Sequence, residues 1–167
     1  MKFLIRKAEP SDSAEILDFL KQVGSESDNL TFGKEGLPFT EEQERNFIES
    51  TNSSENNCII VACDGNKIIG DASLGGNNCD RMKHQRTLGI SVLKDYWGMG
   101  VGSLLLSEII EFAKSSGTEI ITLEVRSDNL RAIGLYEKFG FKKIGQFKGF
   151  FKIDGKYVDF DYMNLYL

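Results

Sequence analysis

Three glycines within five residues, Gly98, Gly100 and Gly102, stand directly before an amphipathic run that ends near Ser116. Free backbone N–H groups at the start of a helix, together with the positive end of the helix dipole, form an anion site. Glycines remove the side chains that would keep a phosphate at a distance. The turn therefore predicts a phosphorylated ligand, and a simple tight turn between a strand and a helix is the alternative interpretation.

The spacing of this turn argues against two common nucleotide sites. A P-loop requires a lysine after its last glycine, and the turn contains none. A dinucleotide fingerprint requires a third glycine at residue 103 or 105, where the sequence has Ser103 and Leu105.

Asn129 and Tyr136 form a second group, because they lie seven residues apart in a segment that predicts a helix. Seven residues are two helical turns, so both side chains lie on one face, about 10 Å apart along the axis. An Asn here could equally be a helix N-cap, for which Ser127 and Asp128 are rivals, and the tyrosine could be a half-buried core residue.

Hydrophobic periodicity and turn residues predict the elements that would position these groups. Asp12 and Glu15 are expected to form a capping box at the start of the first helix, Thr40 should cap the second, and 25–39 is a candidate lid or substrate loop. Antiparallel hairpins are expected at both ends, around one parallel pair formed by 86–93 and 119–126. The expected strands are 2–8, 57–63, 67–74, 86–93, 119–126, 141–153 and 156–167, with a turn at 64–66. The expected helices are 12–24, 40–50, a segment that follows the glycine turn and ends at about 116, and 129–139.

The segments "SVLKDYWGMGVGSLLL" and "LEVRSDNLRAIGLYEKFGF" resemble motif A and the following block of the GNAT superfamily, the Gcn5-related N-acetyltransferases. One departure is Trp97, which occupies the position where the family usually has Gln or Arg. The resemblance implies an α/β fold of the α+β type: a single mixed, mostly antiparallel sheet of about seven strands with a splayed parallel pair, flanked by about four helices. We expect one N-acetyltransferase domain over residues 1–167.

By the same resemblance, the co-substrate is acetyl-CoA and the reaction is direct attack of a primary amine on its thioester, in a ternary complex. The pantetheine arm would bond the backbone of Ser91 and Val92, and the Val92 N–H would polarise the thioester carbonyl. Asn129 would also bond the arm. The pyrophosphate would lie on a turn made of Trp97, Gly98, Met99, Gly100, Val101, Gly102 and Ser103.

The resemblance also implies the catalytic groups. Tyr136 would protonate the departing thiolate. Glu124, on the polar face of strand 119–126, matches the general base of the family's ribosomal-protein alanine acetyltransferases, although it could be a solvated surface glutamate. Glu26 or Asp28 acting through water is the alternative base. A CoA-binding sensor or interaction module with the same fold and no turnover is the competing function.

Composition narrows the remaining possibilities. A net charge of −5 with dispersed Lys and Arg argues against a nucleic-acid partner and mildly favours an amine acceptor, either a small molecule or a peptide amine. The first residues do not resemble a signal peptide and no segment resembles a membrane span, so we expect a cytoplasmic protein. Cys58, Cys63 and Cys79 form no C-x-x-C pair, and His84 is the only histidine, so no metal is expected. The acceptor's identity and a homodimer are left open.

Overall fold

The computed structural model describes residues 2–167, and its strands form one seven-stranded sheet in the order β1-β2-β3-β4-β5-β7-β6. Every neighbouring pair is antiparallel except β4 and β5, as expected from the sequence. The elements are β1 (Leu4–Lys7), α1 (Ser13–Glu26), α2 (Glu41–Asn52), β2 (Cys58–Asp64), β3 (Lys67–Gly75), β4 (Gln85–Val92), α3 (Val101–Ser115), β5 (Ile120–Arg126), α4 (Leu130–Lys138), β6 (Lys142–Ile153) and β7 (Lys156–Tyr166).

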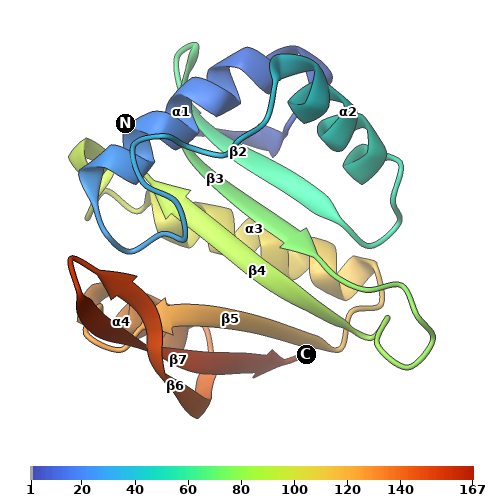
Figure 1. Cartoon of the computed structure of the whole chain (residues 1–167). Helices are drawn as coiled ribbons and strands as arrows, with labels where there is room; N and C mark the ends of the chain where they lie inside the picture. Colours follow the sequence, from blue (N-terminus) through green and yellow to red (C-terminus); the bar gives the residue numbers. More distant parts are fainter. Residues whose placement is uncertain (1) are drawn as a thin grey trace.

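Helices cover both faces of the sheet (Figure 1). α1 and α2 pack on one face of β2 and β3, whereas α3 packs on the opposite face of β2, β3 and β4. On β3, Ala72 and Leu74 are buried on the α3 side, so Asp71 and Ser73 lie on the other face, toward α1. This alternation decides which β3 side chains can reach a ligand.

The parallel pair is the point at which the sheet opens. β4 and β5 are in register only from Gln85 to Thr87, opposite Ile120 to Thr122. Beyond Thr87 the two strands separate, and Figure 1 shows β4 and β5 diverging toward the left of the view. The backbone groups of β4 that would otherwise bond β5 are therefore free of a strand partner.

The local capping predictions had different outcomes. Thr40 caps α2, and its hydroxyl accepts a hydrogen bond from the Gln43 N–H as expected. The capping box predicted for α1 is wrong, because the Asp12 carboxylate binds the guanidinium of Arg6 while Glu15 accepts a hydrogen bond from the Ile68 N–H. α1 also continues two residues past the predicted end, to Glu26.

Candidate active site

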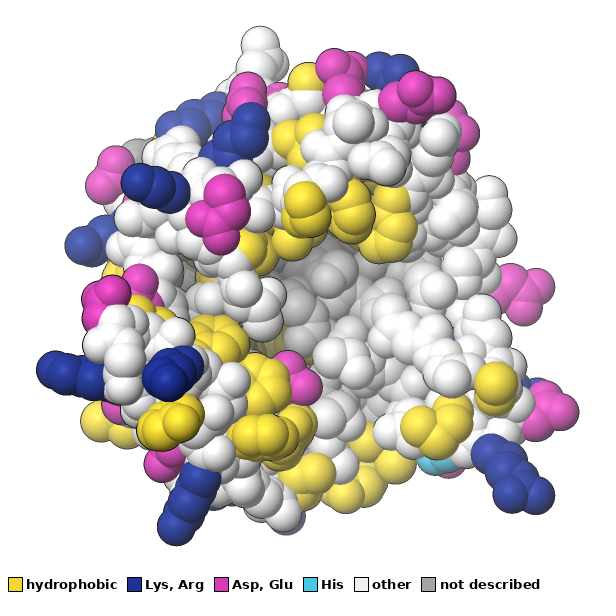
Figure 2. Space-filling model, in the orientation of Figure 1, with side chains coloured by type: hydrophobic (Ala, Val, Ile, Leu, Met, Phe, Trp, Pro, Cys, Tyr) yellow, Lys and Arg dark blue, Asp and Glu magenta, His cyan; other side chains and the backbone are white. Residues whose placement is uncertain are grey.

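A cavity of about 590 Å³ occupies the gap between β4 and β5 and continues beneath α1 and α2. Figure 2 shows a hollow at the centre of this face, with apolar side chains on its upper and lower-left rims. All but one of the predicted site residues line it. The cavity brings together Ser91, Val92, Trp97, Gly98, Gly100, Val101, Gly102, Ser103, Glu124, Asn129 and Tyr136; the exception is Met99, whose side chain is exposed.

The glycine turn has the backbone that its sequence suggests. Gly98 and Gly100 have φ of 76° and 87°, in the left-handed region that glycine tolerates at least cost. Gly100 is the N-cap of α3 and provides no side-chain cap, so the first N–H groups of α3 have no helical acceptor. A Cβ at Gly98 or Gly100 would meet no atom within 4 Å. The turn is thus an open cradle of N–H groups.

Trp97 is held firmly beside this turn. Its indole Nε1 donates a 2.7 Å hydrogen bond to the Val92 carbonyl, and the Arg131 guanidinium carbon lies 3.4 Å from the centre of its ring. Arg131, two residues after Asn129, was not among the site residues predicted from the sequence. Arg131 places a cation beside the position where the family usually has a polar Gln or Arg.

The open edge of β4 presents alternate backbone groups to the gap. The Leu93 N–H bonds the Ile69 carbonyl on β3, and Ser91 is the register partner of Asp71. Along a strand, the N–H and C=O groups of successive residues point to opposite edges. The backbone groups of Val92 and Ile90 therefore point away from β3 and toward the gap. The register therefore assigns the free groups to Ile90 and to the Val92 N–H, since the Val92 carbonyl already accepts from Trp97; Ser91 was predicted in place of Ile90.

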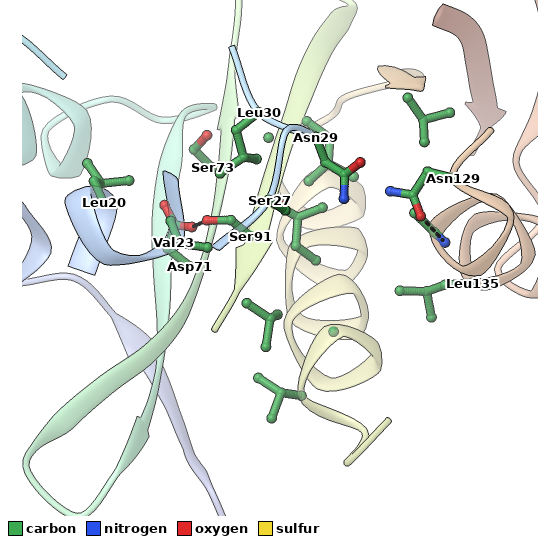
Figure 3. Close-up of a pocket in the computed structure, with 18 of the residues that line it drawn as sticks. Leu20, Val23, Ser27, Asn29, Leu30, Asp71, Ser73, Ser91, Asn129 and Leu135 are labelled. Atoms are coloured by element: carbon green, nitrogen blue, oxygen red, sulfur yellow. Dashed lines mark hydrogen bonds between the residues drawn. The ribbon is translucent and has the colours of Figure 1, made fainter. Parts of the chain in front are cut away.

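Asn129 and Tyr136 lie on α4, at the opposite side of the cavity from Asp71. Asn129 is the N-cap of α4, and its side-chain oxygen accepts a hydrogen bond from the Ala132 N–H. Figure 3 shows its amide nitrogen pointing toward the cavity, so capping and ligand binding use different atoms. Tyr136 is 7% exposed, and burial raises the pKa of its hydroxyl to about 12, which keeps that group protonated.

The loop acids proposed as alternative bases are arranged differently. The Glu26 carboxylate accepts a 2.6 Å hydrogen bond from the Lys94 N–H, which ties the end of α1 to the start of the glycine turn segment. Asp28 lines a shallow groove beside Arg131, outside the main cavity, and its carbonyl accepts from Arg126. His84 is not among the residues that line the main cavity.

The cavity contains two further carboxylates, Glu44 on α2 and Asp71 on β3, that the sequence analysis did not identify. The Ser91 hydroxyl donates a hydrogen bond to Asp71, as Figure 3 shows. Burial raises the pKa of Asp71 to about 6 against the opposing effect of this bond. Burial also raises the pKa of Glu44, and the charge of Asp71 adds to that effect.

The mixed sheet with one splayed parallel pair, and a glycine turn and cavity at the splay, is the architecture of a GNAT acetyltransferase. The model of the acetyltransferase (GNAT) family matches residues 25–141. The chain belongs to this family.

Individual relatives agree with that assignment. A crystal structure of a GNAT-family acetyltransferase from Streptococcus pneumoniae is 35% identical, with a TM-score of 0.97 over 99% of this chain and 100% of that chain. The N-alpha-acetyltransferase RimI of Mycobacterium tuberculosis is 30% identical over 62% of this chain and 63% of its own length. The L-amino acid N-acetyltransferase AaaT of Escherichia coli is 33% identical over 62% of this chain and 65% of its own length. The chain thus spans less than two thirds of the curated relatives that it matches.

Proposed function

We propose that this protein is an N-acetyltransferase that transfers the acetyl group of acetyl-CoA to a primary amine by direct attack in a ternary complex. The observation that carries the proposal is the splay between β4 and β5. It opens a slot flanked by free backbone groups on β4 and by Asn129 and Tyr136 on α4, and the glycine turn lies at one end of that slot. The family assignment supports the same activity.

In this proposal the cofactor lies along the slot. The N–H groups from Gly98 to Ser103 hold its pyrophosphate at the start of α3, where the helix dipole favours an anion. Arg131 adds a cation at that end. The amide arm bonds the free backbone groups of β4 and the amide nitrogen of Asn129.

The acyl transfer would take place between β4 and α4. The Val92 N–H, which faces the gap, would stabilise the developing oxyanion of the thioester carbonyl. Tyr136, kept protonated by its burial, would give a proton to the departing thiolate. Three cavity carboxylates could accept the amine's proton: Glu124, predicted from the sequence, and Glu44 and Asp71.

A thiol-release assay with acetyl-CoA tests the activity. The acceptors would be a panel of polyamines, amino acids, aminoglycosides, simple arylalkylamines and N-terminal peptides, each matched with a blank that lacks the amine. We expect CoA release that depends on one class of amine. Binding of CoA with no release across the panel would favour the sensor function instead. The relatives include an N-alpha-acetyltransferase and an L-amino acid N-acetyltransferase, so their names do not select one acceptor.

A further inference from the structure

Asp71 faces the cavity from the middle of the sheet. It lies on β3 opposite Ser91 of β4, and the Ser91 hydroxyl bonds one of its carboxylate oxygens, Oδ1. Figure 3 shows this pair beside Leu20 and Val23 of α1, on the far side of the cavity from Asn129. The pair therefore lies on the side of the cavity away from the α4 face to which we assign the cofactor arm.

Glu44 approaches the same region from α2. It is only 3% exposed, yet among residues 2–167 its carboxylate has neither a hydrogen-bond donor nor an ion-pair partner. Its carboxylate oxygens keep access to the cavity, where no donor of the described chain offsets their negative charge. Since Glu44 lines the cavity, the missing donor can come from a ligand.

The other groups around this end of the cavity are mainly apolar, and the polar side chains among them, Ser27, Asn29, Thr31 and Ser73, are all uncharged. α1 contributes Ile16, Leu20 and Val23, and α2 contributes Phe47. The segment between these helices adds Leu30, Phe32 and Leu37. Such a lining suits a hydrocarbon or aromatic body better than a polar one.

Cations in the described part of the cavity lie on the opposite side. Arg126 of β5 is bonded to Asp128 through two nitrogens, and Arg131 of α4 is stacked on Trp97. Glu124 of β5 adds a further negative charge to the lining. No Lys or Arg from α1, α2, β3 or β4 is among the lining residues of the described chain, so no cation on that side would pair with a carboxylate of the acceptor.

We propose that Glu44 and Asp71 together bind the ammonium group of the acceptor, and that Asp71 takes its proton. The acceptor is then a primary amine with an apolar body and no carboxylate beside the amino group. This inference rests on the proposed acetyl transfer and specifies the acceptor side of the same site.

An N–H bond of the ammonium breaks, its proton passes to the free carboxylate oxygen of Asp71, and the released lone pair forms the N–C bond to the thioester carbonyl. The C–S bond then breaks and the thiolate takes the Tyr136 proton. A second amine proton restores Tyr136, and Asp71 releases its proton to water. Ammonium and acetyl-CoA thus give amide, CoA thiol and one proton.

Two acceptors that differ only by a carboxylate test the substrate class. Thiol release would be followed with 2-phenylethylamine and with L-phenylalanine at equal concentrations and saturating acetyl-CoA. We expect kcat/KM to be at least tenfold higher for 2-phenylethylamine. Equal or greater activity with L-phenylalanine would overturn the exclusion of carboxylates. If only polar amines such as spermidine react, the proposal that the acceptor has an apolar body is wrong. The substitutions below would then be tested with that amine.

Substitutions test the two carboxylates separately. Asp71→Asn should lower kcat at least 100-fold, within the usual range for loss of a general base, and should leave the CoA Kd unchanged. The kcat/KM of the wild type should rise as the pH increases through about 6, because Asp71 must lose its proton to act as the base. This rise in the pH–rate profile should be absent from Asp71→Asn. Glu44→Gln should raise the amine KM about tenfold with kcat largely kept, as expected for loss of a charge-assisted contact. Asp18→Asn, at an exposed residue of α1, is the matched control.

Each result has a definite meaning. Folding of every variant is checked by circular dichroism and by melting temperature. Retention of both kcat and the pH limb by folded Asp71→Asn would overturn the assignment of Asp71. If Glu124→Gln, and not Asp71→Asn, lowers kcat and removes the rise with pH, Glu124 is the group that accepts the amine's proton. Bound CoA without thiol release from any amine would refute the proposed function itself, whereas wild-type turnover with an unaffected Asp71→Asn would refute this inference alone.

Discussion

Replacing Tyr136 by Phe separates catalysis from structure, because the hydroxyl that is removed makes no hydrogen bond within residues 2–167 and belongs to a residue that lines the cavity. The ring would stay beside Phe141, where the two centroids are 5.8 Å apart. Loss of an unpaired hydroxyl should change the free energy of unfolding by less than about 1 kcal/mol. The fold and the CoA site should therefore survive the substitution.

The expected effect on turnover is much larger. General acid catalysis commonly contributes about 10²- to 10⁴-fold, which corresponds to about 3–5 kcal/mol in the activation free energy. We expect kcat to fall by at least about 100-fold in the thiol-release assay, with the CoA Kd within about twofold of wild type. Because its pKa is about 12, Tyr136 should produce no limb in the pH–rate profile below pH 9.

The matched control is Tyr157→Phe, which removes the hydroxyl of a tyrosine that is 71% exposed on β7 and is not among the residues lining the cavity. This variant should keep wild-type turnover. If Tyr136→Phe also kept turnover to within a few-fold, the leaving thiolate would not need this proton donor, and the role assigned to Tyr136 would be refuted.

Three further outcomes follow from the same structure. Added CoA should change the fluorescence of Trp97, the sole tryptophan of the sequence; CoA binding detected by calorimetry with an unchanged emission would place the cofactor elsewhere. Gly100→Ala should weaken CoA binding and lower the free energy of unfolding by about 1–2 kcal/mol, because φ is 87° at this residue. Gly134→Ala, on α4 where an added Cβ meets no atom, should instead raise the melting temperature. Arg86→Met should lower the free energy of unfolding by about 3 kcal/mol or more, since the buried guanidinium donates to three backbone carbonyls; a near-wild-type chemical denaturation curve would contradict this.

Features that depend on neighbouring residues could be predicted from the sequence. The glycine turn lies between a strand and α3 as expected, and the hairpins turn at Asp64–Gly65–Asn66 and at Asp154–Gly155. Thr40 needs only Gln43 to complete its cap. In each case the controlling contacts lie within a few positions along the chain, so a local pattern contains the necessary information.

The acceptor side could not be predicted in this way. Asp71 and Ser91 meet because β3 and β4 pair in one register, and they are separated by 20 residues. Glu44 reaches the same cavity from α2, where it looks like one of several surface glutamates. The failed cap of α1 has the same cause, since Glu15 has a better partner 53 residues away, at Ile68. Long-range pairing decided the role of each of these carboxylates.

The short pairing of β4 with β5 has a mechanical consequence. Within residues 2–167, three register pairs, Gln85 to Thr87 with Ile120 to Thr122, join the sheet half that contains β1–β4 to the half that contains β5, β7 and β6, next to two hydrogen bonds that the His84 carbonyl accepts from Glu119 and Ile120. The amide arm of bound CoA, if it hydrogen-bonds both sides of the gap, would act as a removable strand. It would then join the two halves of the sheet beyond the short paired region. Hydrogen exchange at the Ile90 and Val92 amides should then slow when CoA binds, and opening of one half-sheet should become coupled to opening of the other.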